Sequence, residues 1–263
     1  MERSKGEYVL ILDSDVVVPE GYLDAVDKEL AAKPADAFGG PDCAHPAFTD
    51  TQKAISYSLP SFFTTGGIRG GKKKLDKFYP RSFNMGVRRD VYNQLEGFSK
   101  MRFGEDIDFS IRIFKAGYRC RLFPEAWVWH KRRTDFRKFF RQVYNSGIAS
   151  INLYKKYPES LKLVHLLPMV FTVGVLSMLL LCLVLLAVAP EYAWLPVVPL
   201  VLYCVLIFID SSRENHSVKI GVLSIASAYI QLMGYGFGFI ESWWKRCVCG
   251  KSEFSAFEKT FYK

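Results

Sequence analysis

Formal charge is scarce in the last third of this 263-residue sequence. Residues 161–263 hold 8 basic and 6 acidic side chains, whereas residues 1–160 hold 27 and 20. This uneven distribution excludes a disordered chain and a plain soluble globule. The sequence therefore predicts a small globular domain followed by membrane segments.

The sequence also lacks an ordered cysteine pattern. Its six cysteines are scattered, and two of them lie inside apolar runs. Neither a disulfide framework nor a zinc site follows from such spacing.

Three runs with little or no charge predict membrane-embedded helices, at residues 163–189, 192–210 and 219–241. The first is long enough to span a hydrocarbon core of roughly 30 Å. The second becomes long enough if Tyr192 and Trp194 lie in the interface, and Pro190 with Glu191 forms the turn before it. The third is rich in small and polar residues, which suits close helix packing or a re-entrant segment, and its crossing of the membrane stays open.

The distribution of Lys and Arg predicts the orientation. Basic side chains crowd ahead of the first run, and the loop at residues 190–193 has none. This pattern favours a cytoplasmic N-terminal part. The tail, residues 241–263, is also basic, which favours the cytoplasmic side. The tail can lie on that side only if the third run does not cross the membrane.

The first half of the sequence predicts an α/β domain. Residues 7–18 read EYVLILDSDVVV, an apolar run without alternation, which is typical of a strand buried on both faces of a sheet. Residues 41–82 are predicted as a long loop. The pattern further predicts helices at 21–33, 89–95 and 105–116 and strands at 37–40, 84–87, 118–123 and 126–130.

Two aspartates follow the first strand. Asp13 and Asp15 form a D-x-D at the carboxyl end of the strand, where open α/β sheets bind ligands. Carboxylate oxygens at that spacing suit Mg²⁺ or Mn²⁺ bridging a diphosphate. The alternative is that they only cap the following helix.

A second acidic group, GEDID, lies at the start of the helix predicted over 105–116. Its carboxylates could simply interact with the helix dipole. The functional alternative is a general base that takes the proton of an attacking hydroxyl.

The third group begins at His130, which ends a strand and precedes Lys131, Arg132 and Arg133. The histidine could be structural, and the cations could face solvent or lipid headgroups. The functional alternative is a metal ligand followed by cations that neutralise a leaving diphosphate.

Residues 135–154 predict an amphipathic, basic and aromatic helix just before the first membrane run. This pattern is typical of a helix in the headgroup plane. The alternative is an ordinary helix that packs its phenylalanines on the sheet. We expect no nucleic-acid partner, because the basic residues gather beside the membrane segments.

In sequence order, the motifs are the strand with DSD, FNMGVRRDVYNQLEGF, GEDIDFSIRIFKAGY and the strand that ends in His130. This order resembles glycosyltransferase family 2, the inverting nucleotide-sugar transferases of the GT-A fold. The resemblance covers about residues 5–155. With its closing helices, the chain is similar to the membrane-attached bacterial transferases of exopolysaccharide and surface-glycan assembly.

The resemblance implies an α/β fold with a partial GT-A (nucleotide-diphospho-sugar transferase) domain and C-terminal transmembrane helices. The expected domains are a catalytic part at 1–134, an interfacial helix and linker at 135–160, and a membrane domain at 161–263. The protein is expected in the inner (plasma) membrane as a multi-pass protein, with its catalytic part in the cytoplasm.

By position, the resemblance implies that Asp13 and Asp15 bind Mg²⁺ or Mn²⁺ and the donor diphosphate, and that His130 completes the metal site. Asp106 is implied as the catalytic base and Glu105 as its neighbour on the acceptor side. Further donor-site residues are expected at Asn84, Met85, Gly86 and Arg133.

The implied reaction is a single displacement that inverts the anomeric configuration. A nucleotide-sugar donor would give its sugar to a glycan or a polyprenyl-linked acceptor at the lipid bilayer. Electrostatic stabilisation of the departing diphosphate is expected to make a large contribution to catalysis.

Two departures from the family pattern limit this expectation. Processive synthases carry Gln-x-x-Arg-Trp on the interfacial helix, whereas this sequence has QVYNS at residues 142–146, which favours transfer of a single sugar. Family members also place a nucleotide-binding half before the D-x-D strand, so the domain is expected to be N-terminally incomplete. The alternative is an inactive truncated remnant, or a non-catalytic membrane protein that binds a glycan or a partner.

Overall fold

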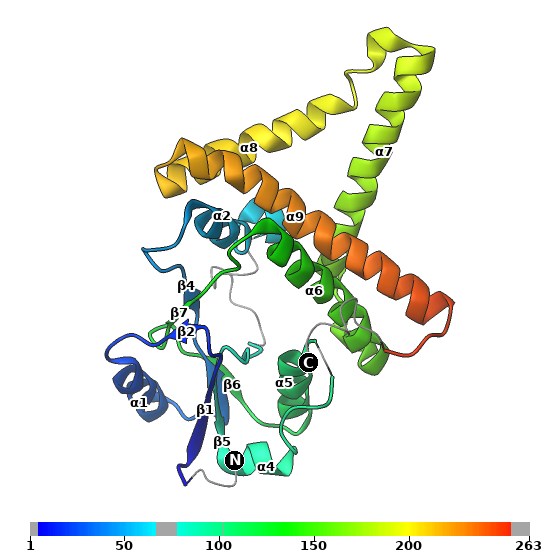
Figure 1. Cartoon of the computed structure of the whole chain (residues 1–263). Coiled ribbons are helices and arrows are strands. Elements are labelled where there is room, and N and C mark those ends of the chain that lie inside the picture. Colours follow the sequence, from blue (N-terminus) through cyan, green and yellow to red (C-terminus); the bar gives the residue numbers. More distant parts are fainter. Residues whose placement is uncertain (1–4, 67–77, 102, 254–263) are drawn as a thin grey trace, which may run out of the picture. The chain divides into compact units, whose positions relative to one another are not determined.

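The structure is a computed structural model that describes residues 5–66, 78–101 and 103–253. The chain divides into two units (Figure 1). The first contains the described residues of 1–47 and 70–132, and the second those of 48–69 and 133–263. Residues 48–66 thus belong with the C-terminal helices, although their neighbours in the sequence belong to the first unit. The chain enters the second unit again after Arg132.

The first unit is built on two small sheets. In the larger one the order is β1 (Tyr8–Leu12), β5 (Asn84–Arg88), β3 (Ala37–Gly39) and β6 (Cys120–Leu122). In the smaller one β7 (Val128–His130) lies between β2 (Val16–Val17) and β4 (Asp42–Cys43). The β3–β6 and β4–β7 pairs are parallel, and the other pairs are antiparallel.

The strand predicted over residues 7–18 is two strands. A turn separates β1 from β2, because Val16 N donates to Asp13 O at 3.2 Å. The expectation that β1 is buried on both faces was wrong. Its residues are half-buried or exposed, because β1 pairs along one edge, with β5, in the described part of the chain.

Helices cover both faces of the larger sheet. Alternation along β3 sends Phe38 toward α1 (Tyr22–Ala32) and Ala37 toward the opposite face, where α4 (Arg89–Gln94) and α5 (Glu105–Lys115) pack. The Phe38 and Phe123 rings stack with their centroids 4.4 Å apart. The three helices predicted for this unit are confirmed to within one residue at each end.

Residues 41–82 are less irregular than predicted. Besides β4, the described part of this segment forms α2 (Asp50–Ser58) and α3 (Phe62–Thr65). A capping box starts α2: the Thr49 side chain accepts from Gln52 N, and the Gln52 side chain accepts from Thr49 N. Residues 67–77 lie outside the described residues.

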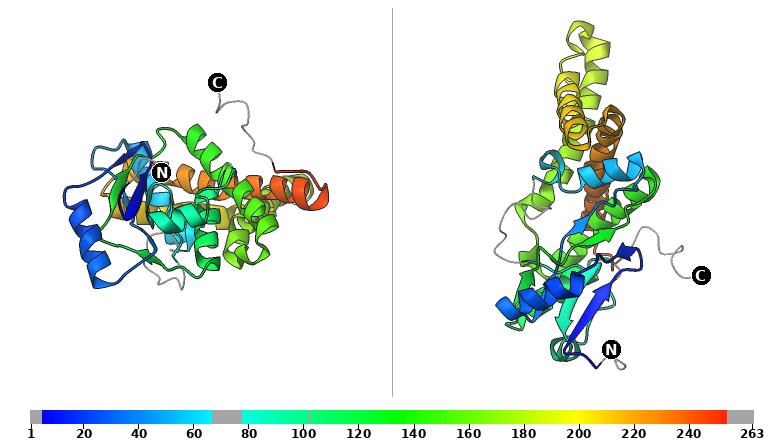
Figure 2. Two further views of the ribbon diagram at one scale, coloured as in Figure 1. Left: turned by 90° about the horizontal axis from the view of Figure 1, so that it is seen from below. Right: turned by 90° about the vertical axis from the view of Figure 1, so that its left-hand side faces the viewer.

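The second unit is helical. Its long helices are α6 (Phe136–Lys156), α7 (Leu167–Val188), α8 (Val197–Asn215) and α9 (Val218–Trp243). α7 and α8 form a hairpin whose turn lies away from α9 (Figures 1 and 2). Shorter helical elements join them, namely η1 (Pro158–Ser160), η2 (Leu163–Leu166), η3 (Pro190–Tyr192) in the hairpin turn, and the π-helix η4 (Trp244–Val248).

Within the described residues, three helical stretches are long and apolar enough to cross a membrane, by length and composition. They are Leu163–Val188, Pro190–Asn215 and Val218–Val248. The share of buried residues in their most apolar parts is 11%, 17% and 50%, respectively. Half of the most apolar part of the third stretch is therefore buried inside the protein.

α9 is the helix against which α2, α6, α7 and α8 pack. A Cβ on Gly234 would press on Val143 of α6, and one on Gly238 would overlap the Tyr144 backbone. The apolar face of α6, with Phe139 and Val143, is buried in a cluster that includes Ile55 of α2. The sequence left two partners open for this face, a lipid surface or the sheet. In the structure, Phe139 and Val143 pack against a helix of the same unit instead.

Candidate active site

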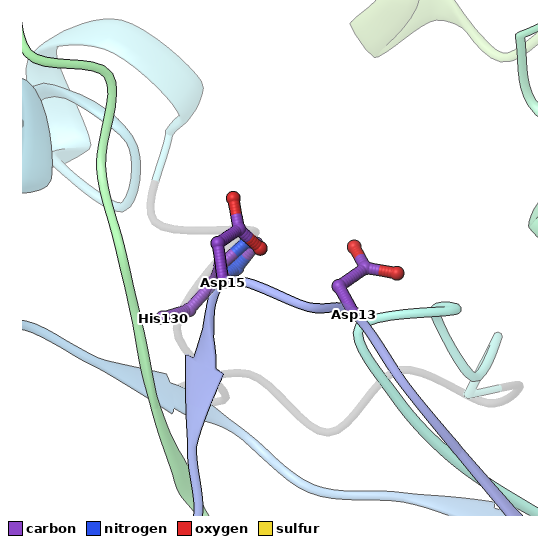
Figure 3. A group of neighbouring side chains, drawn as sticks. All are labelled: Asp13, Asp15 and His130. Atoms are coloured by element: carbon purple, nitrogen blue, oxygen red, sulfur yellow. The ribbon is translucent and has the colours of Figure 1, made fainter.

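The turn after β1 brings two aspartates beside His130. β2 pairs with β7 so that Val16 lies opposite His130, which places the preceding Asp15 next to the histidine. Asp15 Oδ1 lies 3.4 Å from His130 Nε2. One ligand atom from each of Asp13, Asp15 and His130 lies within 4.8 Å of the others. Figure 3 shows Asp15 and His130 together, with Asp13 across the turn.

The His130 ring is held on three sides. Phe83 stacks on it with ring centroids 4.9 Å apart and an interplanar angle of 26°. Its Nδ1 is buried and lies 3.5 Å from Asp42 Oδ2, on the opposite side from Asp15. The neighbours of the ring therefore direct Nε2 toward the two aspartates.

Asp42 is fixed in turn by Arg132, whose Nη1 donates to Asp42 Oδ2. Burial raises the pKa of the Asp42 carboxyl, but His130 and Arg132 outweigh burial and hold that pKa below its usual range. The carboxylate therefore stays ionised beside the imidazole. Such a carboxylate–histidine pair is a common support behind metal-binding histidines.

The chemistry of Asp13, Asp15 and His130 fits a divalent cation. Carboxylate oxygens suit Mg²⁺ and Mn²⁺, and imidazole nitrogen suits transition-metal ions. The buried Nδ1 faces Asp42, which leaves Nε2 for the metal. Three convergent ligand atoms leave room in the coordination sphere for oxygens of a ligand.

The start of α5 holds the second acidic group. Asp106 is buried, with 7% of its surface exposed. Its Oδ2 lies 2.7 Å from Arg81 Nε, and its Oδ1 accepts the backbone N–H of Ile107 at 2.8 Å. Both oxygens of this carboxylate are therefore held in a defined position.

Glu105 links the two acidic groups electrostatically. Burial raises the pKa of its carboxyl, and the negative charges of Asp106 and Asp13 raise it further. A backbone hydrogen bond and Arg81 oppose this shift only in part. The charge of Asp13 thus acts on the start of α5, as one active site would require.

The third carboxylate of this group has a structural contact. Asp108 is fully buried and forms an ion pair with Arg112 at 3.0 Å. Arg112 also donates to the carbonyl oxygens of Leu95 and Gly97. This network fixes the segment between α4 and α5.

Comparisons with known proteins agree with this geometry. Residues 77–209, about half of the chain, match the model of glycosyl transferase family group 2. The chain belongs to this family. The matched residues include Arg81, α5 and His130.

Two individual proteins resemble this family 2 chain. A stretch of 59 residues, 22% of the chain, is 30% identical to the probable glycosyltransferase YdaM of Bacillus subtilis (strain 168) and covers 14% of it. The fold is similar to that of mannosyltransferase PcManGT from Pyrobaculum calidifontis, solved in complex with GDP-Man and Mn²⁺. The TM-score is 0.51 at 17% identity, over 88% of this chain and 64% of that one. The expected α/β fold of the GT-A class is confirmed.

Three of the predicted donor-site residues of this family 2 chain lie in the interior. Met85 is fully buried between β1 and β3, and Gly86 lies against the Phe38 ring, where a Cβ would overlap it. Asn84 is 1% exposed, accepts from Tyr22 Oη at 2.6 Å and donates to Ala126 O at 2.8 Å. These contacts are structural, and a role in a pocket stays a prediction.

Arg133, the predicted donor-site cation, is exposed and belongs to the second unit. The neighbouring Arg132, with a 10% exposed side chain, is the cation that reaches Asp42 behind His130. Sequence reasoning also missed Asp42 and Arg81. The signal for Asp42 was its place just after a strand, as for Asp13 and Asp15.

Proposed function

We propose that this chain is a membrane-bound, metal-dependent inverting glycosyltransferase that transfers a hexosyl unit from a nucleotide sugar to a hydroxyl group. The observation that carries the proposal is the convergence of Asp13, Asp15 and His130 within 4.8 Å, in the same unit as the held carboxylate of Asp106. A cation site and a held carboxylate within one unit are what such a displacement needs.

In this proposal Asp106 is the general base. It accepts the proton of the acceptor hydroxyl as that oxygen attacks the anomeric carbon, and the bond to the nucleoside diphosphate breaks. Arg81 and the N–H of Ile107 orient the carboxylate. Glu105 lies on the acceptor side, and its half-buried carboxylate can accept a hydrogen bond there. A cation held by Asp13, Asp15 and His130 would supply positive charge to the leaving diphosphate.

We further propose that α7 and α8 cross the inner (plasma) membrane as a hairpin, with the catalytic part in the cytoplasm. Their length and low burial support this placement, as does the absence of Lys and Arg from residues 190–193. The acceptor would be a glycan or a polyprenyl-linked sugar of surface-polysaccharide assembly, presented at the bilayer.

The decisive experiment is calorimetric binding of Mn²⁺ with UDP or GDP to the detergent-solubilised chain. GDP enters the test because the structurally similar mannosyltransferase was solved with GDP-Man and Mn²⁺. Mg²⁺ is the second ion to test. We expect metal-dependent nucleotide binding that Asp15→Asn abolishes and Asp27→Asn retains, since Asp27 is an exposed acid on α1.

If Asp15→Asn and Asp27→Asn both abolished binding, the loss would be a general effect of removing a negative charge and would not be specific to Asp15. Absence of nucleotide binding by the unaltered chain would overturn the proposed activity and favour a non-catalytic membrane protein. Binding without transfer from any UDP- or GDP-sugar tested would overturn the catalytic part of the proposal.

A further inference from the structure

We propose that α9 lies in the plane of the membrane surface, along the cytoplasmic ends of α7 and α8, with lipid headgroups as its partner. By length and composition, the α9 stretch qualifies as a third membrane span. Its contacts point to a different arrangement. The inference rests on insertion of the α7–α8 hairpin, which is part of the proposed function, and is independent of the transferase chemistry.

α9 contacts α8 from Tyr203, whose ring centroid lies 5.6 Å from that of Tyr229, to Ser212, and it contacts α7 near the start of α7. Near the start of α9, Gly221 faces Ser212, in the last turns of α8. Fifteen residues later, Gly236 faces Pro168 and Thr172, in the first turns of α7. With a rise of about 1.5 Å per residue, these two points on α9 are roughly 22 Å apart.

Two further contacts fix the same neighbourhood. The rings of Phe171 and Tyr229 have their centroids 5.6 Å apart. Thr172 Oγ1 lies 3.5 Å from Leu232 O. The second half of α9 therefore lies against the start of α7.

A membrane-crossing α9 would make different contacts. If α9 began level with Ser212 and crossed the bilayer, Gly236 would lie roughly 22 Å into a hydrocarbon core of about 30 Å. It would then face the C-terminal part of α7, near Val188. It faces Pro168 and Thr172 instead. α9 thus runs from the C-terminal part of α8 to the start of α7, and α7, α8 and α9 form the sides of a triangle in Figure 1.

α6 gives an independent reason. It lies beside the second half of α9, from Val143 against Gly234 to Asn152, which accepts a hydrogen bond from Arg246. Residues 142–154 of α6 are uncharged, but they would span only roughly 20 Å, less than a hydrocarbon core. Basic side chains are exposed at both ends of α6, namely Arg137, Lys138, Lys155 and Lys156. A helix with these ends fits the headgroup region and cannot accompany α9 through the bilayer.

The end of α9 has the side chains of an interface. Trp243 and Trp244 are 46% and 57% exposed, and Lys245 and Arg246 follow them. Tryptophan is favoured at the level of the headgroups, and cations are favoured at an anionic leaflet. Residues 245–253 then lie on the same side of the membrane as the N-terminal part.

The test labels single cysteines in the full chain from one side of the membrane. Cys43, in the first unit, and Cys249, beyond α9, are both exposed and free. Each would be retained alone, with the other five cysteines replaced by Ala. A third variant carries Glu191→Cys in the cysteine-free chain, because Glu191 is exposed in the hairpin turn. An impermeant maleimide is applied to intact cells and to opened membranes.

We expect external labelling of Glu191→Cys and labelling of Cys43 and Cys249 only after the membranes are opened. External labelling of Cys249 with Cys43 protected would overturn the in-plane arrangement alone. Equal accessibility of all three positions would overturn hairpin insertion and this inference with it. External labelling of Cys43 and Cys249 with Glu191→Cys protected would retain the in-plane helix and overturn the cytoplasmic orientation.

A depth measurement in the cysteine-free chain gives a second, independent readout. Spin labels at Val222→Cys and Trp244→Cys mark the two ends of α9, at positions that are exposed. An in-plane helix gives both labels the same headgroup depth. A crossing helix separates them by roughly 33 Å along the membrane normal, which would overturn the inference.

Discussion

Arg81 and Asp106 form an ion pair at 2.7 Å, and this pair determines how the carboxylate of Asp106 is presented. The second oxygen of the carboxylate is held by the N–H of Ile107. A base held at both oxygens keeps its orientation without substrate. Such positioning is a large part of the catalytic effect of a general base.

We expect Asp106→Asn to lower the transfer rate by about 10²- to 10⁴-fold, because the proton acceptor is lost. Arg81→Gln should lower it by about 10- to 100-fold, because the carboxylate loses its orientation. Both variants should bind Mn²⁺ and nucleotide as the unaltered chain does. The measurement is single-turnover transfer, with calorimetry for the binding step.

Arg88→Gln is the matched control for Arg81→Gln. Arg88 also pairs with aspartates, Asp36 and Asp90, but has no contact with Asp106 in the described residues. Its transfer rate should stay near that of the unaltered chain. An equal loss in both arginine variants would argue against a specific role of Arg81.

Glu105 should lower stability at neutral pH. Its pKa is raised in the folded state, mainly by burial, so the folded chain holds this proton more tightly than the unfolded chain. Protonated Glu105 therefore stabilises the folded chain at pH values below the ordinary glutamate pKa. This contribution is lost as the pH rises through the raised pKa. We expect Glu105→Gln to raise the midpoint of thermal unfolding at pH 7, with the difference disappearing near pH 4.

The control is Glu125→Gln, which removes an exposed glutamate from the same unit and should leave the midpoint unchanged. A lower midpoint for Glu105→Gln at pH 7 would contradict the prediction, since it would mean that the charge itself stabilises the fold.

Asp42 should act on metal binding through His130. Asp42→Asn is expected to weaken Mn²⁺ binding by about 10- to 100-fold, as removal of a carboxylate behind a metal-binding histidine commonly does. In a His130→Ala background the same change should have little further effect, because the residue through which it acts is gone. Electron paramagnetic resonance of free Mn²⁺ measures both affinities.

Asp36→Asn is the matched control for Asp42→Asn. Asp36 also binds an arginine, Arg88, at 2.9 Å, and lies just before a strand of the same unit. It should bind Mn²⁺ as the unaltered chain does. If Asp42→Asn weakened Mn²⁺ binding equally with and without His130, the orienting role of Asp42 would be excluded.

Gly238 allows the backbones of α6 and α9 to approach. A Cβ there would overlap the Tyr144 backbone, which cannot rotate away. Gly238→Ala should therefore destabilise the second unit by about 1–3 kcal/mol. Gly174→Ala in α7 is the control, because a Cβ there meets nothing within 4 Å. Equal unfolding midpoints for the two variants would contradict the packing argument.

Much of the candidate site could be predicted from the sequence, because its residues follow strands. Asp13, Asp15 and His130 each lie at or just beyond the end of a strand with a clear apolar pattern. Asp42 also follows a strand, β3, but nothing in the sequence joined it to His130, and Arg81 has no such signal. Their roles depend on pairings between distant segments, and β4, which carries Asp42, is only two residues long.

The same limit explains the errors in the fold. α2 was missed because its apolar residues are few, although Thr49 and Gln52 give a local start signal. Composition left open whether α9 crosses the membrane and did not indicate that its glycines contact three other helices, α6, α7 and α8.

The segment at residues 48–66 has a practical consequence for dissecting this protein. It lies in the sequence between Asp42 and Arg81, yet Ile55 and Tyr57 are buried among helices that begin after residue 135. A chain cut after residue 134 would therefore expose buried side chains such as Ile55 and Tyr57 and tend to aggregate. A water-soluble fragment requires replacement of residues 48–66 by a short flexible linker as well as removal of the C-terminal helices.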